Sequence, residues 1–141
     1  MTATTERPLK PIKPGNAKSP LVALKRAKKL LSDPRRWTQG EYGRDTDGSN
    51  DVIGEGQCVS FCALGALAVV SGSEDEDLSP GRDALKSVLK GQSKSMADVD
   101  FNDSLPRDAR GHRRLMQWFD RAIKWQAKQD EKAAKAKKSK K

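Results

Sequence analysis

The feature that most constrains the fold is the apolar run Gln57–Val70, in a chain of which one-third of the residues are charged. Phe61, Leu64 and Ala68 recur at three- and four-residue spacing, which is the period of one helical face. Because the positions between them are also apolar, we expect a helix that is buried on most sides. The run of about 14 residues is shorter than the roughly 20 that cross a bilayer. The sequence predicts a central helix over residues 58–71 and no membrane contact.

Gly65 lies in the middle of this predicted helix, where glycine costs about 1 kcal/mol relative to alanine. The neighbouring Ala63 and Ala66 also present little bulk. We therefore expect another segment of backbone to approach the helix closely at Gly65.

Three further helices are expected around the central one. Ser19-Pro20 and Ser79-Pro80 each combine a hydroxyl N-cap with a proline, which is typical of a helix start, and Gly91 is the expected end of the second of these helices. Residues 115–126 carry apolar side chains at helical spacing, and the basic residues of that segment point away from them. The basic residues of this last helix are Arg113, Arg114, Arg121 and Lys124.

The glycine-rich segment after the first helix predicts a β-hairpin. Asp47-Gly48 is a hairpin turn signal, and we expect short strands near residues 38–44 and 51–53. Residues 92–105 are polar and are expected to be irregular. The predicted fold is therefore mainly α (α+β), with about four helices, the central one included, and one small hairpin.

The positive charge is concentrated at the two ends of the chain. Of the net charge of +9, residues 1–20 carry +3, residues 124–141 carry +6, and the intervening residues sum to zero. We expect a flexible Pro/Lys-rich arm over 1–19, one globular domain over 20–126 and a disordered Lys-rich tail over 127–141. The first twenty residues lack the apolar core of a signal peptide, so we expect a cytoplasmic protein with two reduced cysteines.

Three segments together resemble a known family. They are Trp37-Thr38-Gln39-Gly40 with the following Tyr42 to Gly48, then Cys62–Leu67, and then Phe101-Asn102-Asp103 before Phe119-Asp120-Arg121-Ala122. The pattern resembles a family of small domains of unknown function from actinobacteria and bacteriophages, over roughly residues 21–125. Members often carry tryptophan where this chain has Phe61 and Phe101. The resemblance implies a bacterial or phage origin and the cytoplasm of the host, and it implies no activity.

Cys58 and Cys62 are the candidate nucleophiles. A cysteine at a helix N-terminus can have a lowered pKa, and His112 would have to act as its base, oriented by Asn102 or Asp103. The alternative is that both thiols fill space in the core.

Two segments contain residue types that ligate metals. Cys58, Cys62 and His112 lack the close-spaced second pair of a structural zinc site. The segment Asp45–Asp51 has its glycine at the fourth position instead of the sixth position of an EF-hand loop, so a hairpin tip is the better interpretation. We therefore expect no metal and no cofactor.

A binding site is expected where two irregular segments with aromatic anchors meet. If Trp37 and Phe101 pack on the central helix, polar side chains converge near Cys58 and Arg44. The alternative is that these side chains only cap and brace the backbone. The candidate binding residues are Trp37, Gln39, Arg44, Asn102 and Asp103.

The lysines of the C-terminal tail are the candidate polyanion-binding residues, because lysine contacts to phosphates release counterions. They are Lys132, Lys135, Lys137, Lys138, Lys140 and Lys141. The sequence thus favours a small non-enzymatic binding protein whose basic ends contact nucleic acid nonspecifically, with a protein as a further partner. The alternative hypothesis is a thiol-dependent hydrolase or transferase that uses Cys58 or Cys62 with His112.

Overall fold

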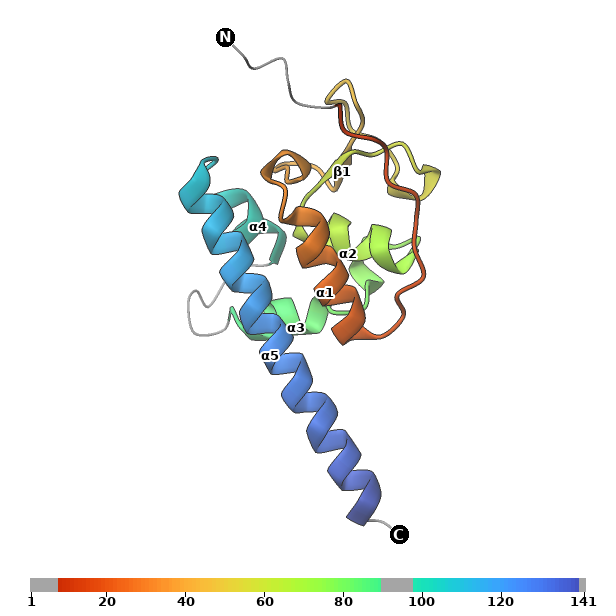
Figure 1. Ribbon diagram of the computed structural model, residues 1–141, viewed down its shortest axis with the longest axis vertical. Helices are drawn as coiled ribbons and strands as arrows, with labels where there is room; N and C mark the ends of the chain where they lie inside the picture. The colour runs from red at the N-terminus through yellow and green to blue at the C-terminus, as the bar shows by residue number, and fades with distance from the viewer. Residues whose placement is uncertain (1–7, 90–97, 140–141) are drawn as a thin grey trace.

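The computed structural model describes residues 8–89 and 98–139, and these residues form a mainly helical fold around one buried helix (Figure 1). Helix α2 (Ala63–Ser71) packs against α1 (Pro20–Leu31) and α4 (Asp98–Ser104), and α5 (Ala109–Ser139) packs against α1 and α3 (Arg82–Ser87). Strands β1 (Gly43–Arg44) and β2 (Ser60–Phe61) form a two-stranded antiparallel sheet. Short 3-10 turns occupy Pro34–Arg36, Ile53–Glu55 and Glu76–Leu78. The predicted helical class and the small sheet are confirmed.

Helix α2 is the centre of the core, but it begins five residues later than predicted. Residues 58–62 are extended because neighbouring segments form hydrogen bonds with their backbone N–H and C=O groups. Ile12 N–H donates to Cys58 O, and Val59 N–H donates to Arg44 O. Cys62 is the N-cap, and its Sγ accepts a hydrogen bond from Gly65 N–H at 3.3 Å. A buried apolar run can form a strand or a helix, and here it forms both in succession.

The hairpin turn forms at the predicted place, but its second strand does not. Gly48 has a φ of +82°, and Asp45 closes the turn by backbone hydrogen bonds with Gly48 and Ser49. Residues 51–53 lead into a 3-10 turn, and β1 pairs instead with β2, with Gly43 opposite Phe61 and Arg44 opposite Ser60. The sheet therefore joins the glycine-rich segment directly to the start of α2.

The predicted close approach at Gly65 is confirmed. A methyl group at Gly65 would collide with the backbone carbonyl of Tyr42. The same strand end is held against the helix because Cys62 N–H donates to Tyr42 O at 3.1 Å.

Helix α4 is a departure from the prediction, which left residues 92–105 irregular. Residues 92–97 lie outside the described part, and residues 98–104 are helical. Phe101 packs edge-on against Trp118 of α5, with ring centroids 4.8 Å apart. Contacts between distant segments, and not helical periodicity, stabilise this short helix.

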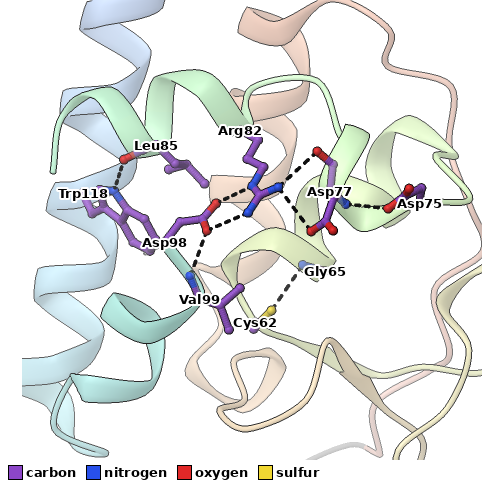
Figure 2. A network of polar contacts seen from close by, with 9 residues as sticks. All are labelled: Cys62, Gly65, Asp75, Asp77, Arg82, Leu85, Asp98, Val99 and Trp118. Carbon is purple, nitrogen blue, oxygen red and sulfur yellow. Dashed lines mark hydrogen bonds and ion pairs between the residues drawn. The ribbon is translucent and has the colours of Figure 1, made fainter. Parts of the chain in front are cut away.

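A buried ion pair fixes the first turn of α4 to α3 (Figure 2). The Asp98 carboxylate is 1% exposed and accepts hydrogen bonds from Arg82 Nε at 2.9 Å and from another Arg82 guanidinium nitrogen at 3.3 Å. Arg82 also pairs with Asp77 at 3.2 Å. Helix α3 begins at Arg82, two residues after the predicted Ser79-Pro80 start, and its predicted end at Gly91 lies outside the described residues.

The two ends of the described chain follow different paths. Residues 12–17 run along the molecule, and the N–H groups of Gly15 and Ala17 donate to Val69 O and Val70 O. At the other end α5 continues as a helix to Ser139, and its last part projects beyond the other elements (Figure 1). The division into a flexible arm, one globular domain and a disordered tail stays a prediction. None of the described helices is both long and apolar enough to cross a membrane.

Candidate functional site

Asn102 is the centre of a polar junction between α4, the segment 37–40 and the start of α2. Its side chain is fully buried, and its Oδ1 accepts hydrogen bonds from Trp37 Nε1 at 2.9 Å and Ala63 N at 3.0 Å. Its Nδ2 donates to Thr38 O at 3.2 Å and to Asp103 Oδ1 at 3.0 Å. One amide thus satisfies a first-turn N–H of α2 and holds the indole of Trp37 in place.

Gln39 extends this junction toward the surface. Its Nε2 donates to the carbonyls of Asn102 and Leu105, both at 2.8 Å, and so satisfies backbone acceptors at the C-terminal end of α4. Its Oε1 accepts a hydrogen bond from Arg107 Nε at 2.7 Å. Nearby, Gly40 N–H donates to Asp103 Oδ1 at 2.9 Å. The predicted convergence of these residues is observed, and most of the contacts brace the backbone.

A pocket of about 550 Å³ opens beside this junction, and we call it the Trp37 pocket. Its lining comes from segment 34–39, from β1 and from the start of α5. The lining residues are Pro34, Trp37, Thr38, Gln39, Arg44, Arg107, Asp108, Ala109 and His112. Asn102 and Asp103 do not line it. Asp103 borders a separate hollow of about 190 Å³ with Tyr42, Cys62 and Val99. Of the two residues predicted beside these polar groups, Arg44 does contact Thr38 and Gln39, whereas Cys62 takes the place of Cys58 beside Asp103.

Arg44 is held rigidly at the edge of the Trp37 pocket. Its Nε donates to Thr38 Oγ1 at 2.8 Å, and its two terminal nitrogens donate to Gln39 O at 3.0 Å and Gly48 O at 3.1 Å. These bonds use three of the five N–H groups of the guanidinium. Within the described residues, no protein acceptor binds the remaining two.

The two cysteines are buried thiols, and the structure joins them by no disulfide. Burial raises the pKa of Cys58 to about 11 and the pKa of Cys62 to about 12. Cys62 does cap a helix, but desolvation outweighs the stabilising hydrogen bonds from Gly65 and Leu64. The lowered thiol pKa that a helix N-terminus can give is therefore not found here.

His112 lines the Trp37 pocket, whereas neither cysteine does. Its Nε2 lies 2.7 Å from the carbonyl of Leu31 and carries the proton, since a carbonyl can only accept. Its ring lies 6.2 Å from that of Trp37, centroid to centroid. The structure thus places His112 with the binding candidates and not with the thiols.

The metal hypotheses gain nothing from the geometry. Within residues 8–89 and 98–139, no three cysteine, histidine or carboxylate side chains lie close enough to hold an ion. The Asp45 carboxylate instead accepts hydrogen bonds from Asp47 N–H at 2.9 Å and Ser49 N–H at 3.0 Å. The hairpin-tip interpretation of this segment is confirmed.

A basic face runs along the outer side of α5. At 3.6 residues per turn, eight exposed cations fall within an arc of about 100°. This basic face consists of Arg110, Arg113, Arg114, Arg121, Lys124, Lys128, Lys132 and Lys135. It begins where α5 packs on the body and continues along the projecting part (Figure 1).

Acidic side chains are sparse on this face. Glu131 lies at its border and pairs with Lys135 at 3.2 Å. Asp120 lies just outside the arc and pairs with Lys28 of α1. Of the tail lysines predicted to bind polyanions, Lys132 and Lys135 are on the face and Lys137 is on the opposite side of the helix. Lys140 and Lys141, and the side chain of Lys138, lie outside the described residues.

The family of the chain follows from comparison with known sequences. The model of the Family of unknown function (DUF6197) matches residues 16–125. The chain belongs to this family. The match agrees with the resemblance over residues 21–125, while the bacterial or phage origin stays a prediction. No curated protein and no solved structure matches the chain. The DUF6197 region contains the polar junction and the whole Trp37 pocket, and it ends before the projecting part of α5.

Sequence reasoning missed Arg107 and the ion pair of Arg82 with Asp98. Arg107 follows a proline in a segment without periodicity, and only its bond to Gln39, 68 residues away, reveals its place. Asp98 is among several carboxylates in a polar stretch, and nothing local distinguishes it as buried.

Proposed function

We propose that this protein is a non-enzymatic binding protein that contacts duplex nucleic acid, independently of base sequence, through the basic face of α5. The supporting observation is the continuity of that face. Cations at 121, 124, 128, 132 and 135 follow one another at three- and four-residue spacing. A solubilising tail needs charge but no alignment of that charge, whereas a helix that lies on a phosphate backbone needs both.

The dimensions suit a duplex. The basic face spans 25 residue steps, from Arg110 to Lys135, and at 1.5 Å per residue it is about 38 Å long. One turn of B-DNA is about 34–36 Å. The face is therefore about as long as one helical turn of a duplex.

The character of the face argues for phosphate contacts without base reading. Trp118 and Phe119 of α5 are buried against the body, and Trp125, which lies beside the basic face, is half-buried and packs against the core. A binder that reads single-stranded bases needs exposed aromatic side chains on which the bases stack. Lysine and arginine contacts to phosphate position a protein on nucleic acid and carry no sequence information directly.

The test compares two triple variants of equal net charge. Lys124→Gln/Lys128→Gln/Lys132→Gln neutralises the middle of the basic face. The control Lys25→Gln/Lys29→Gln/Lys86→Gln neutralises three exposed lysines of α1 and α3. Binding to two fluorescent duplexes of about 20 bp and different sequence, long enough to span the face, is measured by anisotropy at about 100 mM salt.

We expect the face variant to bind both duplexes at least about tenfold more weakly than the parent, and the control to bind within about threefold of it. Equal weakening by both triples would mean that net charge alone attracts the duplex, and it would contradict a role for the face. A large difference between the two duplexes would contradict sequence independence.

No observation favours the thiol-dependent alternative. Both thiols are buried with raised pKa values, and His112 is engaged by the Leu31 carbonyl and lines a pocket that neither cysteine reaches. The cytoplasmic location and a protein partner stay predictions.

A further inference from the structure

The Trp37 pocket lies on a different side of α5 from the middle of the basic face, although Asp108 of its lining pairs with Arg110 at the start of that face. His112 is about 160° around the helix from Lys128, the middle of that face. The pocket and the middle of the basic face can therefore be tested by separate variants. Its lining has a different chemistry, with two guanidinium groups beside two rings.

Arg107 is oriented by a buried amide. Gln39 is only 7% exposed, and its Nε2 is committed to two backbone carbonyls. Its Oε1 must therefore face Arg107, since the flipped amide would place an oxygen against those carbonyls. Arg107 uses only Nε for this bond, and within the described residues its terminal nitrogens have no protein partner. The fold thus fixes the position of the Arg107 guanidinium group, and its positive charge is not neutralised by this bond.

A second set of donors faces the same space. Arg44 retains two unused N–H groups, because Thr38, Gln39 and Gly48 accept only three of its five. Thr38 Oγ1 accepts from Arg44 Nε, so its own proton is free to be donated to a ligand. Asp108 is the one acid of the lining, and its carboxylate accepts hydrogen bonds from Arg110 and from Gly111 N–H. The pocket therefore has an excess of positive charge and of hydrogen-bond donors.

The rest of the lining consists of two rings, tilted 55° to one another, and two small apolar side chains. Trp37 and His112 are both fixed through a ring nitrogen, by Asn102 and by the Leu31 carbonyl. Pro34 and Ala109 complete this part of the wall. Fixed rings beside oriented guanidinium groups are suited to a planar ring that carries an acidic group.

We propose that the Trp37 pocket binds a small molecule with one planar ring and one anionic group, the anion held by Arg107 and Arg44 and the ring lying against Trp37 and His112. Phosphate monoesters and carboxylates share the required chemistry, because a guanidinium binds both in a bidentate manner.

Isothermal titration calorimetry with defined probes tests the proposal. Adenosine 5′-monophosphate and benzoate each combine a ring with an anion, one as a phosphate and the other as a carboxylate. Adenosine supplies a ring alone, and inorganic phosphate supplies an anion alone. We expect at least one of the first two to bind one molecule per chain, at least about tenfold more tightly than adenosine and phosphate. The probe that binds identifies the anion.

Two variants locate the binding. Arg107→Gln removes the oriented charge from an exposed position, and we expect at least about a tenfold loss of affinity. Arg113→Gln removes an exposed charge from the basic face and should leave the affinity within about twofold. The triple variant of the basic face should bind the probe normally, which separates this site from the nucleic-acid contact.

Three results would overturn the proposal. The first is that neither ring-bearing anion binds at about 10 mM, a concentration above the millimolar dissociation constant of even a weak site. The second is that adenosine binds as tightly as its monophosphate. The third is that Arg107→Gln binds like the parent.

Discussion

Asn102→Ala should be among the most destabilising single substitutions in the chain. The substitution removes an acceptor from Trp37 Nε1 and Ala63 N–H, and a donor from Thr38 O and Asp103. Asp103 is exposed and can turn to water, so the other three partners decide the loss.

The magnitude follows from the burial of those three partners. A buried polar group without a partner costs about 1–3 kcal/mol. Ala63 is 1% exposed, so its N–H bears most of that cost, while Trp37 and Thr38 are half-buried and bear less. We expect the free energy of unfolding to fall by about 3–4 kcal/mol, out of the roughly 5–15 kcal/mol typical of a domain.

Urea unfolding followed by circular dichroism measures this loss. With an m-value of about 1.5 kcal/mol per M, the midpoint should fall by about 2 M. Asp100→Ala is the matched control, because Asp100 is an exposed residue of the same helix, and it should lower the free energy of unfolding by less than about 1 kcal/mol. A loss below about 1 kcal/mol for Asn102→Ala would show that the junction does not hold α4 to the core.

Two further predictions concern α2 and the thiols. Gly65→Ala should lower the free energy of unfolding by more than about 2 kcal/mol, because the added methyl group meets Tyr42 O. The control Gly54→Ala places its methyl group in open space and should change the free energy of unfolding by less than about 1 kcal/mol. Equal urea midpoints for the two variants would refute this prediction. Cys58 and Cys62 should resist alkylation at about pH 8 in the native protein and react in urea, because their pKa values are raised to about 11 and about 12. A raised thiol pKa also means that stability falls as pH rises above the ordinary value of 9.0, where the unfolded thiols ionise first, and a urea midpoint that stays constant up to about pH 10.5 would contradict the burial.

Local signals predicted the parts of the fold that depend on neighbours in the sequence. Ser19 does cap α1 through Val22 N–H, and Asp47-Gly48 does form a turn. Gly65 indicated a close backbone approach because a glycine inside a buried helix needs a reason. Ser19 and Asp47-Gly48 shape the backbone within a few residues of themselves, and Gly65 permits a close contact because it has no side chain.

The parts that sequence reasoning missed depend on distant partners. Residues 58–62 are extended only because residues 12 and 44 supply backbone hydrogen bonds. Helix α4 lacks a helical period and is fixed by Asn102 and by the Asp98 pair with Arg82. No local pattern states which distant residue will supply a partner.

The candidate site was predicted in its members better than in its arrangement. Trp37, Gln39 and Asn102 were expected to meet, and they do. The sequence did not show that Asn102 holds Trp37 in place without lining the Trp37 pocket itself. Nor did it show that Arg107 completes the lining of that pocket. The aromatic anchors were visible as residue types, whereas the direction of each amide is set by the groups that surround it in the fold.

The salt dependence of duplex binding tests the central claim, that the basic face of α5 lies along a phosphate backbone. If about six of its cations touch phosphates, the logarithm of the binding constant should fall against the logarithm of salt with a slope of about −5. Neutralising Lys124, Lys128 and Lys132 should then weaken that slope to about −3. A parent slope shallower than about −2, or an unchanged slope in the variant, would contradict the account.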